Sequence, residues 1–237
     1  MVRLAELSVT VNTAFTDPEF PSVTETSLIE SVGGVAKLLT RQYDPQEGAI
    51  TLGGVDLRDA KLDSLRHRIV MLPQEGHLFS GTLADNVRLA DPEASDDEVR
   101  YALEQIGALE RFAALPDGLQ TDVQTRGVRL SAGERQLVGI ARVALANPAV
   151  IVLDEATSSL DPATEAAVEQ ALAAVVEGRT VIIIAHRLST AERADRVVVM
   201  HNGRVVETAS HDELVAQGER YARLWASWQA GVAAGTV

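Results

Sequence analysis

Two apolar runs in the second half of the chain constrain the fold most strongly. Residues 149–153 read AVIVL and residues 180–185 read TVIIIA, and both are rich in β-branched side chains without polar alternation. Runs of this kind are typical of strands that are buried on both faces of a parallel sheet. The alanine-rich stretch from Asp161 to Glu177 between them predicts the crossover helix. Together the three segments predict a βαβ unit, and therefore an α/β fold with a parallel sheet.

A hairpin and a helix are predicted toward the C-terminus. Residues 196–200 and 204–207 are apolar runs on either side of an Asn-Gly pair, which is a strong signal for a tight hairpin. Residues 212–229 carry an apolar stripe at helical spacing, and residues 230–237 are expected to form a frayed end.

The middle of the chain has a different pattern of apolar residues from these runs. Residues 80–146 contain several stretches of helical spacing, and the last of them begins after Ser131 and is stopped by Asn147-Pro148. We therefore predict that helices are inserted into the α/β core as a subdomain. The expected boundaries within the single domain 1–237 are a core at about 1–75 and 149–229, a helical subdomain at about 76–148 and a tail at 230–237.

Composition and charge narrow the possible partners. The 237 residues are 46% apolar, which is enough for a sizeable core, and the formal charge is −13, from 21 basic and 34 acidic side chains. Such a chain would be repelled by a phosphate backbone, so we expect no nucleic acid partner. There is no cysteine, which removes disulfides and thiolate metal sites, and no apolar run approaches the length of a spanning helix.

Two adjacent carboxylates follow the first apolar run. Ligands of α/β sheets bind at the carboxyl ends of the strands, and Asp154 and Glu155 stand at such an end. Asp154 suits Mg²⁺, held directly or through water, and Glu155 suits the base that polarises an attacking water. A helix N-cap beside a solvated acid explains the same two residues when they are taken alone.

A second candidate site opens the long helix. Ser131 followed three residues later by Glu134 is a capping box, which is a sufficient structural reason for both residues. The same geometry aims unpaired backbone N–H groups at an anion, and Gly133 allows close approach to phosphate.

Two further polar residues are ambiguous by themselves. His186 directly follows the second apolar run, and a lone histidine at a strand end is more often structural than catalytic. Gln74, in the segment MLPQ, reads as polar surface when taken singly.

The order of these features resembles the ATP-binding cassette (ABC) transporter ATPase family. Gln74, LSAGERQ at 130–136, VIVLDEATSSLD at 150–161 and then His186 follow its sequence and spacing, and the likeness runs from about Lys37 to about Tyr221. The resemblance implies a P-loop NTPase-like parallel-sheet core with the inserted helical subdomain. It also implies ATP and Mg²⁺ as cofactors.

The family pattern implies roles for the residues around phosphate and metal. Gln74 matches the glutamine that senses Mg²⁺ and the membrane domain, and Asp154 matches the metal-binding Walker B aspartate. Ser131 and Gly133, with Glu134 beside them, match the signature that contacts the γ-phosphate of ATP bound to an opposing subunit. Each active site in this family is shared between two ATPase domains packed head to tail.

The remaining matches lie in the segments after the two apolar runs. Glu155 matches the catalytic base, Asp161 the aspartate of the loop that follows, and His186 the histidine that holds the γ-phosphate. Residues 43–48, 78–86 and 115–118 resemble exporter-type ATPases. This implies a second ABC ATPase domain in a homo- or heterodimer, and membrane domains on another chain, on the cytoplasmic face of the cell membrane.

The phosphate-binding Walker A motif departs from the family pattern. Residues 37–45 fix the register, which places Thr26 and Ser31 at the two glycines, Val32 at the lysine, and Gly33 and Gly34 at the Ser-Thr pair. In that motif the lysine neutralises β/γ charge and the hydroxyl ligates Mg²⁺. Valine supplies no charge and glycine no oxygen, so only the backbone of Gly33 and Gly34 is left to contact phosphate.

Three functions stay open on the sequence alone. The chain is an ATPase subunit that powers an ABC exporter, with its own site impaired; or a non-hydrolytic partner that lends its signature to another subunit; or an inactive, frameshifted remnant. Whether it is itself an enzyme is left open, because the lysine and the hydroxyl of Walker A are absent.

Overall fold

The computed structural model describes residues 7–11, 33–45, 48–73, 76–124, 130–154, 162–185, 188–201 and 204–233. They divide into two compact units. One is built on Asp59–Ile183, and the other combines Leu7–Arg58 with Ile184–Val237.

The first unit contains the predicted sheet. Its strands are β4 (Ile69–Leu72), β5 (Val150–Asp154) and β6 (Thr180–Ile184), in the order β4-β5-β6. β4 and β5 are parallel. The crossover helix α8 (Pro162–Val176) connects β5 to β6, so the predicted βαβ unit and the α/β class are confirmed.

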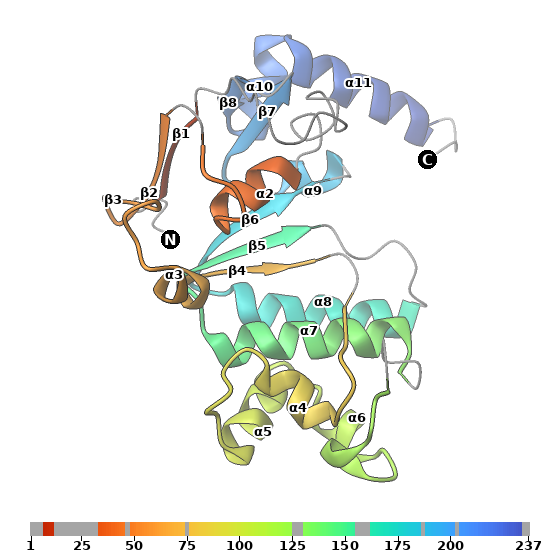
Figure 1. The fold of residues 1–237 in the computed structure, drawn as a ribbon. Helices are drawn as coiled ribbons and strands as arrows, with labels where there is room; N and C mark the ends of the chain where they lie inside the picture. The colour runs from red at the N-terminus through yellow and green to blue at the C-terminus, as the bar shows by residue number, and fades with distance from the viewer. Residues whose placement is uncertain are drawn as a thin grey trace, which may run out of the picture. The chain divides into compact units, whose positions relative to one another are not determined.

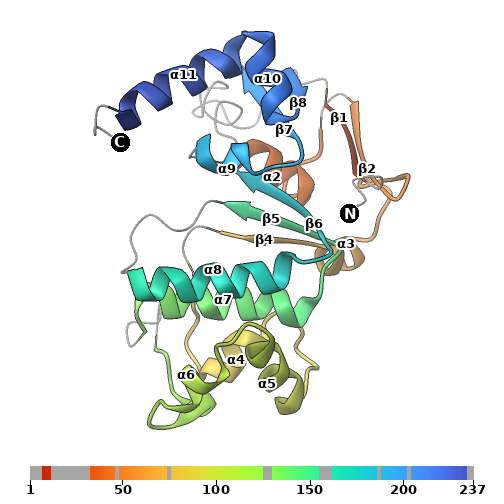
Figure 2. The same cartoon turned by 180° about the vertical axis from the view of Figure 1, so that it is seen from behind.

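Helices cover one face of this sheet in two successive layers (Figure 1). α7 (Ala132–Ala146) and α8 lie against the sheet, and α4 (Leu83–Arg88), α5 (Asp96–Gln105) and α6 (Leu109–Ala113) lie beyond α7, as the view from behind also shows (Figure 2). A helix α3 (Leu62–Arg68) leads directly into β4, and a 3₁₀ turn, η2 (Gly118–Gln120), follows α6. One hydrophobic core joins α4, α5, α6, α7 and α8 to β4 and β5, and its fully buried members include Leu83, Leu103, Phe112, Ile140 and Ile151. The predicted boundary between core and helical subdomain stays a prediction.

Local sequence signals set where these helices begin and end. α4, α5 and α7 each begin with a capping box, formed by Thr82, Ser95 and Ser131 respectively. α7 ends at Asn147, whose φ of 45° is the left-handed conformation that asparagine tolerates well. The expected start and end of this helix are therefore confirmed.

The second unit is built from two small antiparallel sheets and short helices. Strands β1 (Leu7–Val11), β2 (Gly48–Leu52) and β3 (Val55–Asp56) form one sheet, and the predicted hairpin forms the other, as β7 (Val197–His201) and β8 (Arg204–Ala209). Its helices are α2 (Gly33–Leu39), α9 (Leu188–Glu192), α10 (His211–Gln217) and α11 (Arg220–Ala233). Val199, Leu214 and Tyr221 form a small core under the hairpin.

Two expectations about the C-terminal part and the sheet were wrong. The single helix expected over residues 212–229 is two helices, because Gly218 adopts a φ of 71° and ends α10. α11 then continues to Ala233, into the expected frayed end.

The second wrong expectation concerns strand β6, which is not buried on both faces, since Ile183 is 43% exposed. β5 has a neighbour on each side, whereas β6 is at the edge of the three-stranded sheet.

Candidate nucleotide site

The N-terminus of α7 is the best defined part of the candidate site. The Ser131 hydroxyl accepts a hydrogen bond from the Glu134 backbone N–H at 3.2 Å, and the Ser131 N–H donates to Glu134 Oε2 at 2.8 Å. This is a complete capping box, and it fixes the backbone of the first turn. The Arg135 guanidinium donates to the carbonyl of Leu130 at 2.7 Å, which ties down the residue that precedes the cap.

The capping arrangement leaves donors that suit an anion. Ser131 is exposed, and a hydroxyl that accepts one hydrogen bond still has its own hydrogen to donate. Gly133 is buried in the first turn, where helix geometry gives the backbone N–H groups of Ala132 and Gly133 no acceptor within the helix. The structure therefore brings Ser131, Gly133 and Glu134 together at the positive end of a helix of 15 residues.

Asp154 is the predicted metal ligand that the structure describes. It is the last residue of β5, at the carboxyl end of a parallel strand, and it is partly buried. No group of three or more histidine, aspartate or glutamate side chains that could hold a metal occurs among the described residues. Mg²⁺ is usually held by one or two carboxylates together with substrate phosphates, so a single aspartate here fits that ion.

Gly33 and Gly34, the residues at the Ser-Thr pair of the Walker A register, are the first two residues of α2. Neither position has a side chain that can ligate a metal or neutralise a phosphate. Lys37, in the last turn of α2, is the only basic residue of this helix. Its carbonyl accepts from the Gln42 N–H at 2.8 Å, so α2 is closed by turn contacts after Leu39.

Four predicted site residues lie outside the described residues. They are Gln74, Glu155, Asp161 and His186. Their predicted roles in sensing Mg²⁺, activating water and holding the γ-phosphate stay predictions.

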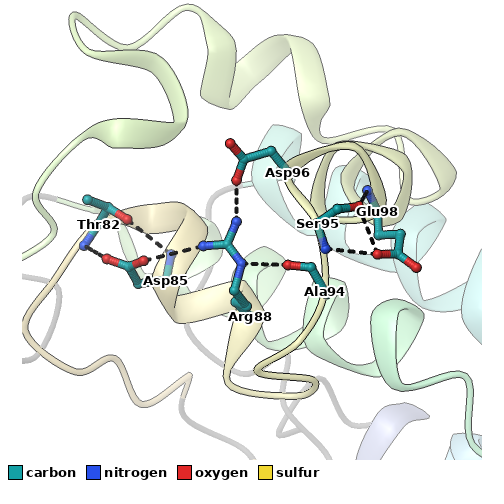
Figure 3. Close-up of polar contacts among 7 residues, drawn as sticks. All are labelled: Thr82, Asp85, Arg88, Ala94, Ser95, Asp96 and Glu98. Atoms are coloured by element: carbon teal, nitrogen blue, oxygen red, sulfur yellow. Dashed lines mark hydrogen bonds and ion pairs between the residues drawn. The ribbon is translucent and has the colours of Figure 1, made fainter.

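A network that sequence reasoning missed links the helices below the sheet (Figure 3). Arg88 on α4 donates to the carbonyl of Ala94 at 2.9 Å and forms an ion pair with Asp96 of α5. It also lies 3.4 Å from Asp85, the acid of the α4 capping box. Hydrogen bonds from Thr82 lower the pKa of Asp85, and hydrogen bonds from Ser95 lower the pKa of Glu98. Arg88 therefore links the α4 capping box, through Asp85, to the residues on either side of the α5 N-cap, Ala94 and Asp96.

Arg142 is the second residue that was missed. It lies on α7 and donates three hydrogen bonds to the segment that precedes and begins α4. A signal for it was present, because Arg142 is the single charged residue in the otherwise apolar run Leu137–Ala146. An arginine in such a run either leaves the core or binds polar atoms within it.

Comparison with known proteins gives the family. A model described as ABC transporter matches residues 34–158, which is more than half of the 237 residues. The chain belongs to the ABC transporter family. The match begins at Gly34 and includes the signature and the strand that ends in Asp154.

Relatives and a solved structure agree with this assignment. The chain is 48% identical over 193 residues to an ATP-dependent lipid A-core flippase of Thiobacillus denitrificans, covering 81% of this chain and 33% of the flippase. It is 44% identical over 191 residues to a multidrug efflux ATP-binding/permease protein of Mycobacterium bovis, covering 81% of this chain and 16% of that protein. The structure of a bacterial Atm1-family ABC exporter with ATP bound is similar at a TM-score of 0.74 and 39% identity, over 84% of this chain and 35% of that one.

The fold of this ABC protein is the P-loop NTPase-like α/β fold that its sequence predicted, with a parallel sheet and packed helices. The chain spans about a third or less of the length of these relatives. No helix within the described ranges is both long and apolar enough to cross a bilayer.

Proposed function

We propose that this chain is the ATP-binding domain of an ABC-type exporter and that it works as a head-to-tail dimer with a second ABC ATPase domain. ATP closes such a dimer and hydrolysis reopens it, which drives substrate through membrane domains. The chain would then lie at the cytoplasmic face of the cell membrane, held there by those membrane domains. The likeness to named exporters over most of this chain supports the proposal.

The geometry at α7 supports a more specific role within that dimer. Ser131 and Gly133 lie in a pre-ordered turn that suits a phosphate, whereas the Walker A positions Gly33 and Gly34 have no functional side chains. We infer that the chain's own ATP site is impaired and that its strongest contribution is to ATP bound by the opposing subunit. Asp154 would hold Mg²⁺ in the chain's own site, where the residues left to bind phosphate are few.

A mixed dimer tests this division of labour. The partner is a related ATPase domain with a complete phosphate loop, and its own signature serine is replaced so that partner homodimers do not turn over ATP. Turnover then depends on the site that combines the partner's phosphate loop with Ser131 of this chain. We expect Ser131→Ala to slow this turnover by about 10²-fold, the typical cost of one pre-organised donor to a transition-state oxygen.

Ser95→Ala is the matched control. Ser95 caps α5 with the same arrangement, accepting from the Glu98 N–H at 3.3 Å, so both variants lose a capping box of the same kind. Only the Ser131 variant should slow the mixed dimer. Equal turnover in the two variants would refute the phosphate contact. A mixture that never forms an ATP-dependent dimer would instead favour the inactive remnant.

The alternative is that the chain hydrolyses ATP in its own site. It predicts turnover by the purified chain that Glu155→Gln abolishes, since a base that polarises the attacking water would be lost. The described residues favour the partner role, because the signature turn is complete and α2 lacks the lysine and hydroxyl of Walker A.

A further inference from the structure

Arg142 fastens one segment of the chain to the middle of α7. Its Nε donates to the Asn86 carbonyl at 2.7 Å, Nη2 donates to Asn86 Oδ1 at 3.0 Å, and Nη1 donates to the His77 carbonyl at 2.8 Å. All three acceptors are amide oxygens from residues 56 or 65 positions away in the chain. Burial lowers the pKa of Arg142, so the guanidinium is partly withdrawn from water and depends on these oxygens.

Asn86 passes this contact on to Phe79. Its amide nitrogen donates to the Phe79 carbonyl at 2.9 Å and to the Thr82 carbonyl at 3.0 Å, and its Oδ1 accepts from the Phe79 N–H at 2.9 Å. Asn86 is 1% exposed, so no solvent competes for these bonds. The two backbone polar groups of Phe79 are therefore held by one buried side chain, and Arg142 holds that side chain in turn.

A second contact lies near the start of α7. A methyl group built on Gly76 would lie 2.3 Å from the carbonyl oxygen of Arg135 and 3.0 Å from the backbone nitrogen of Gln136. Only glycine allows the chain to pass this close to the first turns of the helix. The segment 76–81 thus meets α7 at Arg135, close to Ser131, and again at Arg142, about two turns further on.

The segment held in this way presents an exposed aromatic pair. The rings of His77 and Phe79 are packed edge to face with centroids 5.2 Å apart, and Phe79 is 56% exposed. Two contacts on one helix prevent the segment from rotating about either of them.

We propose that Arg142 is a positioning residue which, with Gly76, makes segment 76–81 and α7 move as one body, so that the position of Phe79 sets the position of Ser131. What Ser131 does for ATP rests on the proposed function, but the attachment of the segment to α7 does not. A displacement of the exposed aromatic pair would therefore be delivered to the signature turn, and loss of Arg142 would disconnect them.

Hydrogen exchange of the purified full chain tests the attachment directly. In Arg142→Gln the amide of Phe79 should exchange about tenfold faster, because a bond to a charged donor is lost and Asn86 is free to turn. Arg88→Gln is the matched control, since Arg88 also binds a backbone carbonyl through its Nε, at 2.9 Å, but joins α4 to α5. The control should accelerate exchange at the start of α5 and leave segment 76–81 protected. Equal exchange at Phe79 in both variants would overturn the proposal.

Gly76→Ala covers the case in which Arg142→Gln does not fold. Its added methyl group must displace the segment from Arg135. The substitution changes none of the groups that bond to Arg142, so those bonds are affected only indirectly. Faster exchange over residues 76–81 with unchanged exchange in α5 supports the two-contact attachment, and unchanged exchange in both regions contradicts it.

The mixed dimer supplies the functional measurement, at a temperature where calorimetry finds each variant fully folded. Arg142→Gln should lower kcat while the KM for ATP stays within about twofold, because a misplaced Ser131 acts on the transition state more than on binding. Arg142→Lys should restore part of kcat, since lysine keeps the charge but cannot reach all three oxygens. An unchanged kcat in Arg142→Gln would overturn the link to Ser131. If Ser131→Ala itself has no effect, the proposed function fails, and the exchange experiment still decides whether Arg142 holds the segment.

Discussion

The starts of α2 and α7 occupy the two positions at which an ABC domain is expected to meet phosphate, and their side chains differ sharply. α7 is capped by Ser131, whose hydroxyl and N–H both bond to Glu134, and Gly133 is buried in the first turn of this helix. α2 begins with Gly33 and Gly34 and has no acidic residue in its first turn. The first is a complete capping box, which we propose contacts phosphate, and the second has no side chain at Gly33 or Gly34 that could do so.

The difference separates two functions that most ABC domains combine. A signature turn acts on ATP bound by another subunit, whereas a Walker A helix acts on the chain's own ATP. Because Gly33 and Gly34 lack the side chains needed for the second task while Ser131 and Glu134 hold the first turn of α7 in place, we propose that the chain is better equipped to complete a neighbour's site than its own. The following experiments test this difference between α2 and α7.

Rebuilding the start of α2 should have the largest effect. The rebuilt variant carries five substitutions, which follow the register set by residues 37–45: Thr26 and Ser31 become Gly, Val32 becomes Lys, Gly33 becomes Ser and Gly34 becomes Thr. Mg²⁺-dependent ATP turnover of the purified chain should rise by at least about 10²-fold, because pre-organised charges and donors at a transferring phosphate contribute that much or more. A coupled phosphate-release assay measures it.

Two controls accompany the rebuilt chain. Glu155→Gln in the rebuilt background should return turnover to the background rate. Lys37→Gln in the parent chain should leave nucleotide affinity unchanged, because Lys37 is in the last turn of α2 and not at its start. Glu155-dependent turnover in the parent chain would contradict the contrast between the two helices.

Glu134→Gln tests the other helix. Glutamine preserves the capping box, so the turn keeps its shape, but the variant removes one negative charge close to where the partner's γ-phosphate would lie. We expect the mixed dimer to bind ATP about fivefold more tightly, since two like charges a few ångströms apart near a surface repel by about 1 kcal/mol or more. Equilibrium titration at low salt measures it. Weaker binding would mean that Glu134 accepts a hydrogen bond from ATP itself.

The sequence predicted those parts of the fold that depend on neighbouring residues. The β-branched runs gave β5 and β6, and the Ser131 and Asn147 signals gave both ends of α7, because caps act within one turn of the chain. The break at Gly218 was missed, since a single glycine is tolerated inside a helix and only the observed φ of 71° identifies it as a stop.

Residues of the candidate site could be placed from the sequence only where a motif itself fixes the local backbone geometry. Ser131 and Glu134 were placed correctly at the start of α7 because a capping box has its own sequence signature, and the phosphate contact of Ser131 and Gly133 stays a prediction. Arg142 and Asn86 were missed because their contact joins residues 56 positions apart, and neither residue type alone indicates its partner. Contacts of this kind depend on how α4 packs against α7, which local patterns do not contain.

Replacing Ser131 or Ser95 by alanine should lower the free energy of unfolding by the same amount. Both serines are exposed N-caps that accept from the backbone N–H three residues on, at 3.2 and 3.3 Å. Each Ser→Ala change should therefore lower the free energy of unfolding by about 1 kcal/mol. Urea denaturation measures both. A much larger loss for Ser131→Ala would mean that the serine has a structural role beyond capping, and that slowed turnover in the mixed dimer cannot be ascribed to phosphate contact.

Acid should destabilise the first turns of α5 and α10 and leave the first turn of α2 unchanged. The Ser95 N–H and hydroxyl lower the pKa of Glu98 below its ordinary value of 4.5, and Ser210 does the same for Glu213 at the start of α10. Since the folded pKa lies below the unfolded one, this stabilisation is complete above pH 4.5 and is lost as the pH falls through the lower, folded value. Both carboxylates are fully exposed, so the effect on stability is small and is best measured locally.

Amide exchange in the first turns of α5 and α10, corrected for the intrinsic rate, should speed up as the pH falls from 5 toward 3. The first turn of α2 has no acidic residue and should show no such change. Glu98→Gln should remove the pH dependence in α5 alone, and its persistence there would show that another group is titrating.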